Sequence, residues 1–157
     1  MYHVLIAAVI LADQTIKYFI RANLILGESI PVISGILHIT HVENSGGAFG
    51  ILAGLTSLLS VVTAVMVAAI AVYIHMNRKS GRRIFLLALS LICAGGAGNL
   101  IDRLRFGVVT DFIDFRVFPV FNLADICVCC GCGLLLLYFI FLDKKESIKT
   151  EAGGNEQ

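Results

Sequence analysis

The chain has 157 residues, of which 58% are hydrophobic and 15% are charged, and its mean hydropathy is +0.90. A water-soluble domain usually carries about 25% charged residues, so this composition excludes that class and indicates an integral membrane protein. The formal net charge of +1 excludes a general electrostatic attraction to nucleic acid.

Four apolar stretches are long enough to cross a bilayer, and they predict helices at about residues 2–22, 51–76, 84–104 and 123–142. We expect one membrane-embedded domain over residues 1–142, followed by a polar tail, residues 143–157, without regular structure.

The first helix differs from the other three because Asp13, Gln14 and Lys17 interrupt its apolar sequence. The four-residue step from Asp13 to Lys17 places opposite charges on adjacent turns of one face. Two interpretations stay open: an ion pair that makes the helix tolerable in lipid, or a contribution to a functional site.

Basic residues gather in the loop between the second and third helices and in the tail. Lys and Arg in short loops mark the cytoplasmic side of a membrane protein, so we expect this loop and both termini in the cytoplasm. The basic residues are Arg78, Lys79, Arg82 and Arg83 in the loop and Lys144, Lys145 and Lys149 in the tail.

The two remaining connections, residues 21–50 and 103–121, then lie on the outer side. Apolar and polar residues alternate over residues 36–42 and 108–113, which predicts short strands. The predicted fold is therefore four transmembrane helices with a small extracytoplasmic sheet that cradles a substrate at the membrane surface.

Polar residues are concentrated where these connections meet the helices. Asn44, in a glycine-rich segment, supplies a donor and an acceptor at the membrane edge. Asn99, Asp102 and Arg103 lie three and four residues apart on one helical face, where they can converge on one neighbour. Because polar groups at this depth are costly, a functional role is favoured over a simple helix cap.

Asp111 and Asp125 are candidates for a catalytic pair. If the outer loop brings them together, two carboxylates that share a site cannot both ionise easily, so one keeps its proton. The other can then accept a proton from water as it attacks a peptide carbonyl, as in an aspartic protease. Spacing alone does not distinguish Asp111 from Asp114, and two unrelated loop carboxylates remain an alternative.

Five motifs, in order along the chain, resemble the motif set of lipoprotein signal peptidase, also called signal peptidase II. Together they cover the chain except for its tail. The motifs are Asp13-Gln14-x-x-Lys17, Asn44-x-Gly46-x-Ala48-Phe49-Gly50, GGAGNLIDR (residues 95–103), Val109-x-Asp111-Phe112 and FNLAD (residues 121–125).

The resemblance implies an aspartyl endopeptidase of the bacterial inner membrane, with four helices and its active site on the extracytoplasmic side. Such enzymes remove the signal peptide from prolipoproteins, cutting before a cysteine that carries diacylglycerol. They need no metal or other cofactor, and globomycin inhibits them. The expected partners are therefore diacylglyceryl prolipoproteins, membrane lipid and globomycin-type inhibitors.

The motifs also imply roles for individual residues. Asp111 and Asp125 correspond to the catalytic aspartates, which favours Asp111 over Asp114. The residues implied to support the pair or to hold substrate are Asp13, Lys17, Asn44, Asn99, Asp102, Arg103 and Asn122.

Two features depart from the family pattern. Thr110 stands where the family usually has valine, which adds a hydroxyl beside the predicted catalytic residue. The other is a cluster of cysteines at the start of the fourth helix, for which apolar packing is favoured over a metal site because helical thiols at this spacing point in several directions. The cluster is Cys127, Cys129, Cys130 and Cys132.

Two rival functions remain. A cation-binding or transport protein would use Asp102, Asp111 and Asp125 as oxygen ligands. An intramembrane aspartyl protease of the presenilin type would be expected to show a Gly-x-Gly-Asp motif, which the sequence lacks.

Overall fold

The computed structural model describes residues 1–45 and 56–141. The predicted glycine-rich segment from Gly46 to Gly50, the predicted start of the second helix and the tail lie outside these residues.

Within the described residues, four helices are long and apolar enough to cross a membrane: α1 (Tyr2–Asn23), α2 (Thr56–Asn77), α3 (Arg83–Phe106) and α4 (Leu123–Phe141). Of the most apolar 18 residues of α3, 56% are buried within the protein, whereas the share is 22% or less for each of the other three helices. The helix α3 is therefore the centre of the bundle. The predicted membrane α-helical fold class is confirmed.

Small residues let α3 and α4 approach closely. A methyl group added at Gly95 would collide with the backbone oxygen of Ala124, and one added at Gly131 would lie 2.6 Å from a side-chain carbon of Ile92. Lipid is as apolar as the helix surfaces, so close packing, not removal of apolar surface from water, holds such helices together. These contacts fix the start of α4 against α3.

Three strands form an antiparallel sheet in the order β1 (Ser29–Ile33), β2 (Leu37–Asn44) and β3 (Val109–Asp114). The alternating segments correctly indicated β2 and β3, but β1 was not predicted. Its Pro31 argues against a strand in sequence, yet proline is tolerated on an edge strand, where its missing N–H need not pair. The edge position of β1 explains the difference.

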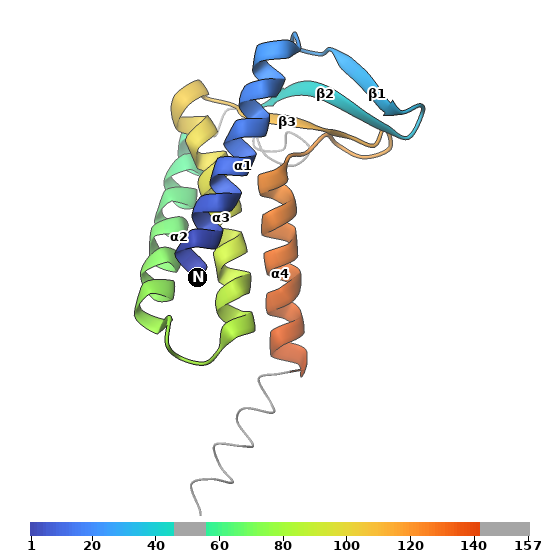
Figure 1. The fold of residues 1–157 in the computed structure, drawn as a ribbon. Coiled ribbons are helices and arrows are strands. Elements are labelled where there is room, and N and C mark those ends of the chain that lie inside the picture. The colour runs from blue at the N-terminus through green and yellow to red at the C-terminus, as the bar shows by residue number, and fades with distance from the viewer. Residues whose placement is uncertain (46–55, 142–157) are drawn as a thin grey trace, which may run out of the picture.

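The sheet lies across one end of the helices, and the α2–α3 turn lies at the other end (Figure 1). Gly107 ends α3 in the left-handed conformation, with φ of 76°, and turns the chain directly into β3. An apolar cluster of Ile20, Leu24 and Phe112 joins the end of α1 to the sheet. Residues from α1, α3, β3 and α4 therefore meet where the bundle touches the sheet.

Candidate active site

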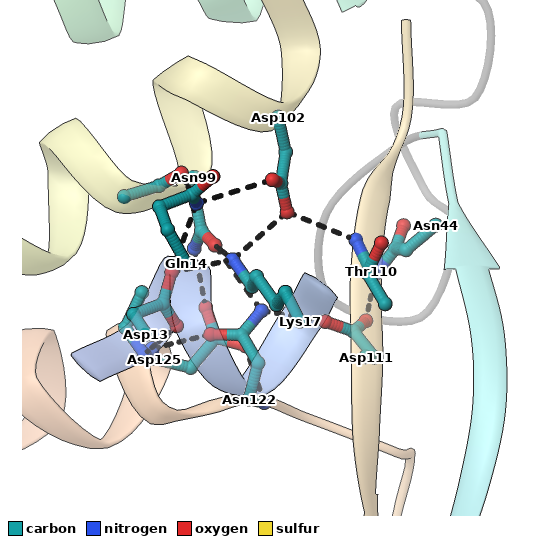
Figure 2. A network of polar contacts seen from close by, with 12 residues as sticks. Asp13, Gln14, Lys17, Asn44, Asn99, Asp102, Thr110, Asp111, Asn122 and Asp125 are labelled. Carbon is teal, nitrogen blue, oxygen red and sulfur yellow. Dashed lines mark hydrogen bonds and ion pairs between the residues drawn. The ribbon is translucent and has the colours of Figure 1, made fainter. Parts of the chain in front are cut away.

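Asn122, the residue before α4, contacts both predicted catalytic carboxylates. Its side-chain Nδ2 donates a hydrogen bond to Oδ1 of Asp111 over 2.6 Å, and its backbone N–H donates to Oδ2 of Asp125 over 3.2 Å. Asn122 is fully buried. The structure thus brings Asp111 and Asp125 to the same residue from two different elements (Figure 2).

The start of α4 orients Asp125. The backbone N–H of Asp125 donates to Oδ1 of Asn122 over 2.9 Å, and with the reciprocal bond from Asn122 this forms a capping box. The other carboxylate oxygen of Asp125 accepts a hydrogen bond of 2.8 Å from Nδ2 of Asn99 on α3. Both oxygens therefore have donors, while the side chain remains partly exposed.

Asp111 is buried, with 2% of its surface exposed, and it accepts a second hydrogen bond of 3.0 Å from Nδ2 of Asn44 on β2. Burial raises the pKa of Asp111 to about 6; the amide of Asn44 opposes this rise, and the negative charge of Asp125 adds to it. The two carboxylates thus occupy different environments, since one is buried and the other is partly exposed.

Lys17 lies at the centre of a buried polar network next to Asp111 and Asp125. Its ammonium lies 2.9 Å from Oδ2 of Asp13, 2.9 Å from Oδ2 of Asp102 and 2.9 Å from Oδ1 of Asn99. The predicted pair of Asp13 and Lys17 therefore exists, but Lys17 also serves a carboxylate on α3. Figure 2 shows how α1 and α3 meet through these side chains.

Asp13 also reaches α4, because its Oδ1 accepts a hydrogen bond of 3.0 Å from the backbone N–H of Ala124. This bond satisfies a donor that the first turn of a helix otherwise leaves free. Asp13 and Lys17 consequently link α1 to both helices that carry the site.

Arg103 was predicted to converge with Asn99 and Asp102 on one neighbour, but only the latter two meet, at Lys17. Arg103 is partly buried, and its buried Nε has no hydrogen-bond partner among the residues that the structure describes. Within that part of the chain, the unpaired Nε leaves one donor of Arg103 free to bind another molecule.

Asp114 lies elsewhere, although it shares β3 with Asp111. Its carboxylate accepts a hydrogen bond of 2.7 Å from Thr40 and lies 3.3 Å from Nη1 of Arg116. The hydrogen bond from Thr40 lowers the pKa of Asp114. Residues three apart on a strand point to opposite faces, which separates Asp114 from Asn122 and the site.

Sequence reasoning missed the parts played by Gln14 and Arg21. Gln14 Nε2 donates to Oδ1 of Asp102 and to the carbonyl of Gly98, both over 3.1 Å. Arg21 continues the four-residue steps of Asp13 and Lys17, and that spacing was the available signal.

The cysteines of α4 point in different directions, since Cys127 is buried and Cys129, Cys130 and Cys132 are exposed. Over residues 1–45 and 56–141, no three His, Cys, Asp or Glu side chains are grouped so as to hold a metal ion.

The sequence profile of a protein family described as signal peptidase (SPase) II matches residues 5–141. The chain belongs to the signal peptidase II family. Two relatives, each named lipoprotein signal peptidase, come from Halothermothrix orenii and Moorella thermoacetica. The first is 45% identical over 88% of this chain and 94% of its own length, and the second is 46% identical over 87% and 94%.

Solved structures agree with membership of the signal peptidase II family. A bacterial membrane enzyme solved by the in meso method at 2.3 Å superposes with a TM-score of 0.80 and 31% identity, over 99% of this chain and 92% of the other. A second one, solved at 1.9 Å, gives a TM-score of 0.78 with 34% identity, over 90% and 93%. The chain is thus a bacterial membrane protein of a peptidase family.

Proposed function

We propose that this protein is an aspartic endopeptidase that removes the signal peptide from diacylglyceryl-modified prolipoproteins, cutting before the lipidated cysteine. The observation that carries the proposal is the meeting of Asp111 and Asp125 at Asn122, with one carboxylate buried and the other partly exposed. Membership of the signal peptidase II family supplies the class of substrate.

The two carboxylates divide the proton transfers of amide hydrolysis. Asp111 holds the proton of the pair up to about pH 6, because burial raises its pKa to about 6. Asp125 accepts a proton from water as the water oxygen attacks the peptide carbonyl, and Asp111 donates its proton to the oxygen that becomes negative. When the C–N bond breaks, the amine leaves with the proton from Asp125, and the diol returns the other proton to Asp111.

The surrounding amides keep this pair aligned without taking part in proton transfer. Asn99 and Asn122 hold Asp125, and Asn44 and Asn122 hold Asp111. Asparagine does not titrate in the working range, so these bonds fix geometry while leaving the proton to the carboxylates. Arg103, with its unpaired Nε, is the donor that we assign to a substrate carbonyl.

The position of the pair suits a substrate held in the bilayer. We place the signal helix among the spans, the diacylglycerol in the lipid and the scissile bond at the outer surface, where the sheet covers the helix ends. Anchoring by lipid fixes the depth of the cut and reduces the search for the enzyme to two dimensions. Globomycin-type inhibitors would occupy the same place.

The test is cleavage of a purified, diacylglyceryl-modified precursor, followed as a shift on a gel. We expect Asp111→Asn and Asp125→Asn to reduce cleavage by at least 1,000-fold, because each removes a proton acceptor or donor from the only described carboxylate pair at Asn122. Asp114→Asn is the matched control, since it changes the same strand on its other face, and it should retain cleavage.

Three results would contradict this proposal. They are wild-type cleavage by Asp111→Asn or Asp125→Asn, loss of cleavage in Asp114→Asn alone, and cleavage that a chelator abolishes and a divalent ion restores. The last result would favour the cation-dependent alternative.

A further inference from the structure

Arg21, near the end of α1, contacts three residues that lie close to the candidate active site: Thr110, Asp102 and Phe106. Its Nη1 donates a hydrogen bond of 2.8 Å to the hydroxyl of Thr110 and lies 3.6 Å from Oδ1 of Asp102. Its guanidinium lies over the ring of Phe106, 4.4 Å from the centroid. The side chain of Arg21 is 20% exposed, so the hydrogen bond, the ion pair and the ring contact all form in a largely buried environment.

The buried charges give Arg21 an electrostatic role. Asp13 and Asp102 bring two negative charges, and both bond to the single ammonium of Lys17. A buried charge without a partner is costly, and Arg21 supplies the second positive charge of this group. The ion pair therefore holds the guanidinium beside β3.

Thr110 is held at two points. Its backbone N–H donates to Oδ2 of Asp102 over 3.2 Å, and its hydroxyl accepts the bond from Arg21. Thr110 has 1% of its surface exposed, and the next residue is Asp111. Because consecutive strand residues point to opposite faces of a stiff backbone, fixing Thr110 on one face fixes where Asp111 projects on the other.

We infer that Arg21 and Thr110 form a clamp that positions Asp111 against Asn122, which rests on the proposed function. The clamp joins α1 to β3 through a hydroxyl and a guanidinium, with Asp102 of α3 bonded to both residues. Neither Arg21 nor Thr110 touches the reacting atoms, so both are positioning residues. Their effect falls on turnover, because a carboxylate displaced by a fraction of an ångström slows proton transfer more than it weakens substrate binding.

The test compares Thr110→Val, Thr110→Ser, Arg21→Met and the double variant Arg21→Met with Thr110→Val, all with the full-length protein and a lipidated precursor. Valine has nearly the volume of threonine but no hydroxyl, whereas serine keeps the hydroxyl. The family motif usually has valine at this position, so the hydroxyl bond to Arg21 is a feature of this chain's own support of Asp111. We expect Thr110→Val to lower kcat by about 10-fold with KM within about twofold, and Thr110→Ser to keep most of the wild-type kcat.

The double variant tests whether the two residues act together. If they form one clamp, the fold-loss of kcat in the double variant is smaller than the two single-variant fold-losses multiplied together. The reason is that the second change removes an interaction that the first has already broken. Multiplicative losses, or a wild-type kcat in Thr110→Val, overturn the clamp. An equal loss in Thr110→Val and Thr110→Ser also overturns it, since the hydroxyl would then be irrelevant.

The same assay separates this inference from the proposed function. If the wild-type protein cleaves the precursor and Asp111→Asn does not, the proposed function stands. The Thr110 and Arg21 variants then test the clamp alone. Failure of the wild-type protein to cleave the precursor, or full cleavage by Asp111→Asn, overturns the function and the clamp with it.

Discussion

At the scale of single residues, the environment of Asp111 decides its chemistry. Its carboxylate is nearly inaccessible to water and receives hydrogen bonds from two amides, Asn122 on one oxygen and Asn44 on the other. Desolvation disfavours the charged form, and the amides only partly compensate for it. Asp111 therefore holds a proton at a pH where an ordinary aspartate has lost it.

The pH dependence of activity follows from this protonation. In the proposed mechanism Asp111 must carry a proton to donate it, so kcat/KM should fall as the pH rises above about 6, the value to which burial raises its pKa. The hydrogen bond from Asn44 lowers that pKa, so Asn44→Ala should move the alkaline limb to higher pH. Rate profiles of both proteins from pH 4 to pH 9 measure the shift.

The control for this profile is Asn77→Ala, which removes an exposed amide at the far end of α2 that bonds only to the carbonyl of Tyr73 among the described residues. Its alkaline limb should coincide with that of the wild type. A limb that stays in place in Asn44→Ala would show that Asp111 is not the group that loses the proton.

The free energy of unfolding should also depend on whether Asp111 is protonated. The pKa of Asp111 rises from its ordinary 3.8 to about 6 on folding, so the native state binds the proton more tightly and the free energy of unfolding falls between about pH 4 and pH 6. The loss amounts to about 3 kcal/mol at 1.36 kcal/mol per pKa unit. Asp111→Asn should remove this fall, as measured by thermal unfolding in detergent across that range.

Asp114 should change stability with pH in the opposite direction to Asp111. The hydrogen bond from Thr40 lowers its pKa, so its carboxylate stabilises the fold above the ordinary pKa and the contribution is lost as the pH falls. The stability that Asp114→Asn forfeits should therefore grow with rising pH. The same trend in both variants would refute the assignment of a raised pKa to Asp111.

At the scale of the elements, the packing of α4 on α3 sets the position of Asp125. A methyl group at Gly95 would meet the backbone oxygen of Ala124 and lie 2.8 Å from a side-chain carbon of Val128. Backbone cannot move aside as a flexible side chain can, so the whole start of α4 would have to shift. Asp125, one residue beyond Ala124, would shift with it.

Gly95→Ala should consequently destabilise the protein by about 1–3 kcal/mol, as overpacking does, and also reduce cleavage. Gly133→Ala is the matched control on α4, because nothing lies within 4 Å of the added methyl group. Thermal unfolding and the cleavage assay should show an effect for Gly95→Ala and none for Gly133→Ala. Equal behaviour of the two variants would mean that close packing at Gly95 does not hold α4 in place.

At the scale of the whole molecule, the sheet and the basic loop lie at opposite ends of the bundle (Figure 1). The loop between α2 and α3 contains Arg78, Lys79 and Arg82, which favour the cytoplasmic side. The opposite end, with Asp111 and Asp125, then faces outward. We therefore expect the active site to open on the extracytoplasmic side of the membrane.

This orientation can be measured by cysteine labelling in a chain whose five native cysteines are replaced by alanine. Ser34, in the exposed turn between β1 and β2, should react as Ser34→Cys with a membrane-impermeant maleimide on intact cells. Ser80, in the α2–α3 turn, should react as Ser80→Cys only after the cells are made permeable. The reverse pattern would invert the proposed topology.

The sequence by itself determined the four spans and the residue types of the site. Hydropathy depends on local composition, so long apolar stretches predicted the helices, even though polar residues interrupt the first one, and alternation predicted β2 and β3. The motifs singled out Asp111, Asp125 and Asn122. Within α1, the helical period sufficed to predict that Asp13 and Lys17 face each other, as they do over 2.9 Å.

Only the tertiary structure decided which of these residues touch across elements. The bond from Ala124 to Asp13 joins residues 111 positions apart, and that from Arg21 to Thr110 spans 89 positions. Periodicity relates residues within one helix or strand, but it carries no information on how two elements are placed against each other. That placement depends on close packing at small residues such as Gly95 and on the turn at Gly107, and it brings Asp111, not Asp114, to Asn122.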